Sequence, residues 1–180
     1  MSRHQTFEET FNELLGRTEC RAAHMETRDS YMPDDPRFVS WSRGHREDPD
    51  DPTSWWGPWH QTVRDTVTRG VAVHRARVVS EPLSAYMRFE YDITFTNVTA
   101  GEQVRWLSRR HASDLALPGN DFWLFDDFAV VFLHFTGEGA IPTDEGDYEL
   151  STDPHVIRMC ATSFDAVWQR ATPHAKYWPG

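Results

Sequence analysis

The sequence predicts an α/β fold in which a single-layer mixed sheet is flanked by helices. Three observations support this prediction. Residues 71–80 are rich in valine and alternate as a strand does. A helical segment and the apolar segment 104–107 follow directly, which is the strand–helix–strand order of a parallel crossover. The apolar segments 121–126 and 129–135 are separated by a tight turn and predict an antiparallel hairpin.

Length and composition indicate one domain spanning residues 1–180, because 180 residues with 39% hydrophobic content can bury a core. The net charge of −10 argues against general nucleic-acid binding, which needs a basic surface. Cys20 and Cys160 lie far apart, and the sequence has no CxxC motif, signal peptide or long apolar segment. We therefore expect a cytoplasmic location, no membrane association and reduced thiols.

The N-terminal segments predict a helix, a strand and a long excursion. Thr6 and Glu9 form a capping-box pattern that starts a helix running to Leu15, with Gly16 as its stop. Residues 20–27 are expected to form the first strand. Residues 29–58 contain five prolines and an acidic run, so they predict a long surface excursion with one helical turn near 38–43. The tryptophans of this region (Trp41, Trp55, Trp56 and Trp59) indicate that parts of it are held in place.

The segments from 58 to 107 surround the strand at 71–80. Residues 58–69 predict a helix, because proline stands near its start and Gly70 follows its end. Residues 84–96 are ambiguous, because their aromatic residues alternate as in a strand while Ser84 is a good helix cap. We favour a helix from about Ser84 that frays before Asn97, followed by a strand at 104–107.

The C-terminal segments predict a hairpin and a helix. Residues 121–126 form a short buried strand, and Asp126 and Asp127 form the turn. Residues 129–135 are the most apolar run and are expected to form a central strand. A loop follows at 137–147. Asp153 caps a helix at 154–171, which carries an apolar stripe of Val156, Met159, Cys160, Phe164, Val167 and Trp168.

Three motifs resemble an actinobacterial family that is classified as a domain of unknown function, number 6879. They are RVVSEPLSAYMRFEY (77–91), NVTAGEQVRWLSRR (97–110) and DFWLFDD (121–127). The resemblance covers most of the chain and supplies no catalytic residues. Genes of this family often stand beside helix-turn-helix regulators, so the resemblance implies a regulatory or accessory role.

The order of elements also resembles half of a phospholipase D-like domain. Those enzymes use a His-x-Lys-x-x-x-x-Asp motif, in which the histidine is the nucleophile and the lysine binds phosphate. Aligning Asp126 with the motif's aspartate puts Gly119 and Asp121 at the histidine and lysine positions, and aligning Asp127 puts Asn120 and Phe122 there. Both alignments lack the nucleophile, so we expect the fold without phosphodiesterase activity.

The best candidate site is a set of arginines and carboxylates. Arg75 and Arg77 share one strand face by the period of two, and Arg77 with Arg105 is expected to clamp an anion at the ends of neighbouring strands. The alternative is an Arg–Glu network in which Arg77 holds Glu90 or Glu102 and ties the sheet to its helix. The full candidate set is Arg75, Arg77, Arg88, Glu90, Arg105, Asp121 and Trp123.

We expect no metal and no cofactor. The histidines form no HxH or HExxH motif, and turn and capping roles explain Asp121, Asp126 and Asp127 more simply than a cation site does.

Two functions remain open. The first is a non-catalytic regulatory or accessory protein that binds a protein partner, such as a helix-turn-helix regulator, or an anionic small molecule. The alternative is a small-molecule enzyme of a specialised, natural-product biosynthetic pathway with a Trp-lined pocket. A deep pocket lined by the excursion tryptophans, Arg77 and Arg105 would favour a ligand sensor or an enzyme, and a flat apolar patch would favour a protein partner.

Overall fold

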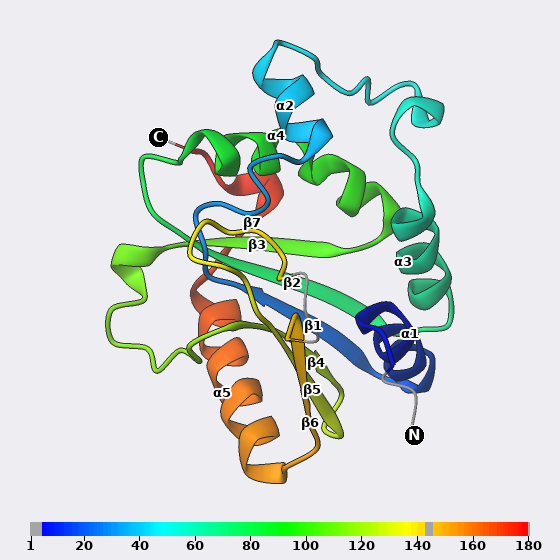
Figure 1. The fold of residues 1–180 in the computed structure, drawn as a ribbon, viewed down its shortest axis with the longest axis vertical. Helices are drawn as coiled ribbons and strands as arrows, with labels where there is room; N and C mark the ends of the chain where they lie inside the picture. The colour runs from blue at the N-terminus through cyan, green and yellow to red at the C-terminus, as the bar shows by residue number, and fades with distance from the viewer. Residues whose placement is uncertain (1–4, 143–145, 180) are drawn as a thin grey trace.

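A computed structural model describes residues 5–142 and 146–179. Its centre is a seven-stranded mixed sheet in the order β6-β5-β4-β1-β2-β3-β7 (Figure 1). The strands are β1 Arg21–Glu26, β2 Ala72–Val79, β3 Gln103–Ser108, β4 Asp121–Phe125, β5 Ala129–Leu133, β6 Tyr148–Ser151 and β7 Thr172–Pro173. β1, β2 and β3 are parallel, whereas β4, β5 and β6 pair antiparallel. The predicted fold class, with parallel crossovers first and a hairpin second, is confirmed.

Helices cover both faces of the sheet. They are α1 Phe7–Arg17, α2 Pro36–Ser42, α3 Pro58–Thr68, α4 Ala85–Ala100 and α5 Pro154–Arg170. α5 packs alone on one face, where Phe164 and Val167 meet apolar residues of β1, β2 and β4. α1, α3 and α4 lie on the other face, and α2 packs on the outer side of α4 (Figure 1).

Local sequence signals explain where the helices begin and end. Thr6 and Glu9 form the predicted capping box of α1. The ambiguous segment 84–96 is helical, because the Ser84 hydroxyl accepts a hydrogen bond from Met87 N at 3.0 Å. α4 continues to Ala100 without fraying, and Gly101 ends it in the left-handed conformation with φ of +109°. The expected stop at Gly16 is wrong, since α1 runs one residue further.

The excursion at 29–58 is partly ordered by its tryptophans. The helical turn expected near 38–43 is α2, and Trp41 Nε1 donates to Asp92 on α4 over 2.7 Å. Trp55 Nε1 donates to the carbonyl of Asp48 over 2.9 Å, which folds the acidic run back on itself. Side chains of residues 48–54 nevertheless remain exposed.

Three details of the C-terminal half differ from expectation. β5 is not central: β1 holds that place, and β5 is second from one edge. β5 is apolar because both its faces are covered, with Val130 in the core under α5 and Val131 in the core under α1. The short strands β6 and β7 were not predicted. Residues 143–145 of the expected loop at 137–147 lie outside the described residues.

Alternation along β1 and β2 places a polar set on one face of the sheet. Residues 23 and 25 of β1 and 76 and 78 of β2 pack under α5. His24, Glu26, Arg75 and Arg77 therefore point to the opposite face. This face is closed by α1 and α3 at one end and by α4 at the other, so the polar residues lie between two apolar clusters.

Candidate functional site

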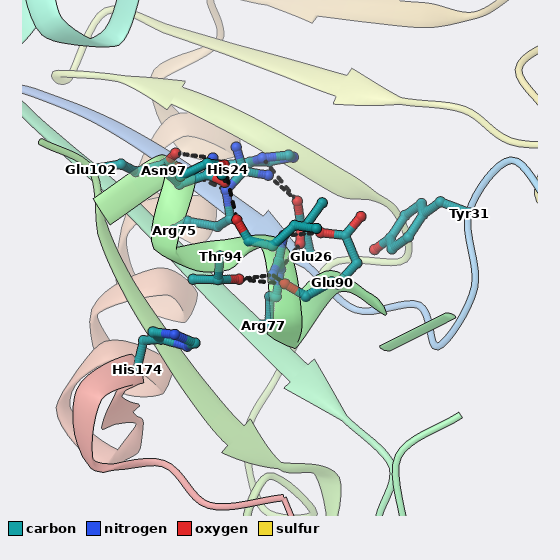
Figure 2. A network of polar contacts seen from close by, with 12 residues as sticks. His24, Glu26, Tyr31, Arg75, Arg77, Glu90, Thr94, Asn97, Glu102 and His174 are labelled. Atoms are coloured by element: carbon teal, nitrogen blue, oxygen red, sulfur yellow. Dashed lines mark hydrogen bonds and ion pairs between the residues drawn. The ribbon is translucent and has the colours of Figure 1, made fainter. Parts of the chain in front are cut away.

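A buried charged cluster connects the sheet to α4. It consists of Glu26, Arg75, Arg77, Glu90 and Glu102. Figure 2 shows these side chains converging from β1, β2, α4 and, for Glu102, the turn between α4 and β3, with Tyr31 pointing toward them from the segment after β1. The alternative of an Arg–Glu network between sheet and helix is what the geometry shows.

Arg77 is the centre of this cluster, and each of the three nitrogens of its guanidinium group donates a hydrogen bond. Its Nε donates to Glu26 Oε2 at 2.5 Å, and its Nη2 donates to Glu90 Oε2 at 2.5 Å. Its Nη1 donates to Thr94 Oγ1 at 2.8 Å. Its guanidinium also lies 4.9 Å from the ring centre of Trp106. Arg77 thus ties β1, β2, β3 and α4 together.

Arg75 extends the cluster to the C-terminal end of α4. Its Nε donates to Glu102 Oε1 at 2.7 Å, and its Nη1 donates to Glu26. Glu102 also accepts a hydrogen bond from Asn97 Nδ2 at 2.7 Å. Burial alone raises the pKa of Glu26, but Arg77 and Arg75 outweigh this effect and hold the pKa well below its usual range. Glu26 is therefore ionised at neutral pH.

His24 differs from the rest of the set because it has no hydrogen-bond partner. Only 7% of it is exposed, and both ring nitrogens are buried without a partner in the structure. Its ring stacks on Trp123 at 4.3 Å between centroids, and Nδ1 lies 3.4 Å from Glu26 Oε1. Burial, helped by the charge of Arg75, lowers the pKa of His24 to about 3. His24 is therefore neutral at physiological pH.

His24 and the cluster residues other than Glu102 line a cavity of about 500 Å³. Aromatic side chains form much of its wall, contributed by Phe7, Tyr31, Trp59, Tyr86, Trp123 and Phe135. Its polar lining includes His24, Glu26, Arg75, Arg77, Glu90 and Asp121. His60 also lines it but is satisfied, since Gly57 N donates to Nδ1 at 2.9 Å and Nε2 contacts Thr96 Oγ1 at 3.1 Å.

Asp121 fixes the segment that follows β1 against the cavity. Its Oδ1 accepts from the backbone and hydroxyl of Thr27 at 2.8 and 2.7 Å, and its Oδ2 accepts from the Tyr31 hydroxyl at 2.5 Å. Burial raises the pKa of Asp121. Met32 N then donates to the carbonyl of Gly139 at 2.9 Å, which joins this segment to the loop after β5 at the cavity rim.

Five of the seven predicted site residues come together here. Arg75, Arg77, Glu90, Asp121 and Trp123 all line the cavity.

Arg88 and Arg105 do not join them. Arg88 is exposed, because two positions along a helix separate it by about 200° from Glu90. Arg105 lies on the α5 face of the sheet, where its Nη1 donates to the carbonyl of Trp168 at 2.9 Å and its guanidinium covers the Trp168 ring. The predicted clamp of Arg77 with Arg105 is wrong, because the register places Trp106 opposite Arg77.

Sequence reasoning missed His24, Glu26 and Tyr31. The first two carried a usable signal, because they alternate within the predicted strand 20–27 as Arg75 and Arg77 do in the next strand. Of the four excursion tryptophans, Trp59 lines the cavity. Trp41 packs against Phe89 on the outer side of α4.

The aspartates considered for a cation lie apart. Asp121 begins β4, whereas Asp126 follows its end and accepts backbone hydrogen bonds from Glu19, Cys20 and Arg21. Within residues 5–142 and 146–179, no group of three or more His, Cys, Asp or Glu side chains is arranged to hold a metal ion. The described helices also include none with the length and apolar character needed to cross a membrane.

Comparison with solved structures finds similar folds at low identity. TrmBL2, an archaeal chromatin protein described as showing a novel mode of DNA binding, is 12% identical with a TM-score of 0.46. That match covers 91% of this chain and 49% of TrmBL2, so the chain spans about half the length of that protein. Nuc, a phospholipase D family member from Salmonella typhimurium, is 12% identical with a TM-score of 0.46, and the match covers 92% and 90% of the two chains.

Sequence comparisons identify the family of the chain. A search of curated proteins gave no match. The family model described as "Domain of unknown function (DUF6879)" matches residues 9–179, which is nearly the whole chain. The chain therefore belongs to the DUF6879 family.

Proposed function

We propose that this protein binds a small organic molecule in the cavity over β1 and β2 and acts through this binding, as a regulatory or accessory protein. The observation that carries the proposal is the cavity itself. Its volume of about 500 Å³ falls in the range of ligand sites, roughly 300–1,000 Å³, and it combines aromatic walls with a few placed polar groups. Of the exposed large apolar residues, Met32 and Ile141 line this same cavity, and the others come from separate segments: Val98, Leu150, Met159 and Trp178.

The chemistry of the lining supports binding over catalysis. No Ser, Cys or Lys nucleophile is among the described residues that line the cavity. His24, with a pKa of about 3, is a poor general base near neutral pH, because efficient bases have pKa values close to the working pH. Glu26 is committed to two arginines. These groups recognise a ligand and hold the walls in place.

A second candidate function is a small-molecule enzyme of a specialised biosynthetic pathway. One observation favours it: Asp121 is a buried carboxyl group with a raised pKa at the edge of the cavity, which is a common property of catalytic acids. Conversion of a bound compound by the purified protein, lost in Asp121→Asn, would establish this function in place of the first.

The proposed site can be tested by filling the cavity. Leu133 ends β5 and lines the cavity, so Leu133→Trp is expected to occupy ligand volume. Met159→Trp is the matched control, because Met159 is exposed on α5 on the other face of the sheet. Compounds would be screened by thermal shift and their affinities measured by titration calorimetry. We expect Leu133→Trp to lose at least tenfold in affinity and Met159→Trp to bind as the parent does.

Two results would reject the proposal. One is a ligand whose affinity is the same in Leu133→Trp and in Met159→Trp, since that ligand lies outside the cavity. The other is a screen in which stabilisation comes only from compounds that bind both variants alike.

A further inference from the structure

We propose that the ligand of this cavity is an organic cation: a flat apolar group carrying a protonated amine. This inference rests on the proposed function and specifies the class of ligand. It follows from three independent properties of the cavity, namely its charge balance, its hydrogen-bonding groups and its walls.

The charge balance of the buried cluster is negative. Glu26, Glu90 and Glu102 supply three carboxylates, and Arg75 and Arg77 supply two guanidiniums. The cluster thus carries one excess negative charge. Glu26 and Glu90 face the cavity, whereas Glu102 does not line it and pairs with Arg75.

The rest of the lining does not remove this excess. Asp121 adds another carboxyl group to the lining. Burial, together with the charge of Glu26, raises the pKa of this group. At the rim, the exposed Arg37 and the half-buried Asp147 carry opposite charges. A buried carboxylate excess is costly, and a bound cation offsets that cost.

Two of the residues that line the cavity, Arg77 and His24, also favour a donor ligand. All three nitrogens of Arg77 already donate to Glu26, Glu90 and Thr94, so an anion would have to displace these partners. His24 is more than nine-tenths buried, lines the cavity and makes no hydrogen bond at either nitrogen, although Nδ1 lies 3.4 Å from Glu26 Oε1. A neutral imidazole presents one acceptor nitrogen, which the N–H groups of an amine can satisfy.

The walls match the same chemistry. Tyr31, Trp59, Tyr86 and Trp123 line the same cavity as Glu26 and Glu90, and aromatic faces attract cations through the negative potential of the ring. The same rings bury a flat apolar group. A neutral aromatic compound would use the walls without relieving the charge, and an aromatic acid would add to it.

Three compounds of matched shape separate these cases: 2-phenylethylamine, 2-phenylethanol and 3-phenylpropionate. Titration calorimetry at pH 7 is expected to give the amine at least tenfold tighter binding than the alcohol, and the acid the weakest binding. Glu90→Gln should weaken the amine about tenfold and leave the alcohol unchanged, because the glutamine oxygen still accepts from Arg77. Glu13→Gln, the same change on the exposed surface of α1, should alter neither. Asp121→Asn serves as the second cavity variant if Glu90→Gln does not fold.

The outcomes test the cationic ligand and the binding function of the cavity separately. Equal or tighter binding of the alcohol or the acid in the cavity overturns the cationic ligand and leaves the binding function standing. Failure of the amine to bind at millimolar concentration also overturns it. Binding of all three compounds that is unaffected by Leu133→Trp rejects the cavity itself, and the proposed function with it.

Discussion

Replacing Arg77 by alanine tests the role of the buried charged cluster. Arg77 is only 3% exposed and donates to Glu26, Glu90 and Thr94. Its removal leaves Glu90 without a cationic partner and Glu26 with Arg75 alone. Breaking a buried ion pair by removing one partner costs about 3–5 kcal/mol. For a domain of this size each kcal/mol lowers the melting temperature by about 2–4 °C, so we expect a fall of about 6–20 °C.

The measurement is calorimetric melting at pH 7, with urea unfolding as a second probe of the free energy of unfolding. Arg88→Ala is the matched control, because Arg88 is exposed on the solvent side of the same helix that carries Glu90. A surface change of this kind alters stability by no more than about 0.5 kcal/mol. Arg77→Lys should fall between the two, since one ammonium cannot replace a fork with several donors. If Arg77→Ala melts within about 2 °C of Arg88→Ala, the cluster does not hold the sheet to α4.

Three further predictions follow from buried and exposed groups. His24 has a pKa of about 3 in the folded state, below its unfolded value of 6.5. Between these values the unfolded chain binds a proton at His24 that the folded chain does not bind. The free energy of unfolding therefore falls as the pH drops from 6.5 toward 3. This loss is about 1.4 kcal/mol per pH unit from His24, and acid unfolding of His24→Gln should begin at lower pH than in the parent. Cys20 is exposed, whereas Cys160 is buried with its pKa raised by burial to about 11, so a maleimide should label one thiol in native protein and two in urea. Limited proteolysis should cut first within residues 47–53, and protection there equal to that of the core would contradict the exposed excursion.

Most of the fold could be predicted because its signals are local. Capping at Thr6, Ser84 and Asp153 set the starts of three helices. Alternation predicted the strand at 71–80, and continuous apolar runs predicted the strands at 121–126 and 129–135. β6 and β7 gave no such signal, because they are short and β6 is largely exposed. β5 is apolar because α1 and α5 cover its two faces, and a strand can be covered on both faces without being central in the sheet.

The site was predicted less completely because it depends on the register between strands. Alternation placed Arg75 and Arg77 on one face, and that prediction is confirmed. Their main partner, Glu26, comes from a strand that is parallel to β2 and 51 residues away in sequence. Arg105 is adjacent to Trp106 in sequence, and only the pairing of β2 with β3 shows that Trp106 faces Arg77 while Arg105 faces α5.

The most direct test of the proposed ligand site is a crystal structure of the protein with the tightest-binding compound from the screen. Our account predicts electron density for the compound in the cavity, with its polar group near Glu90 and His24 and its apolar part against Trp123. Density for the compound on the outer surface, with the cavity side chains unmoved and nothing bound among them, would contradict the account.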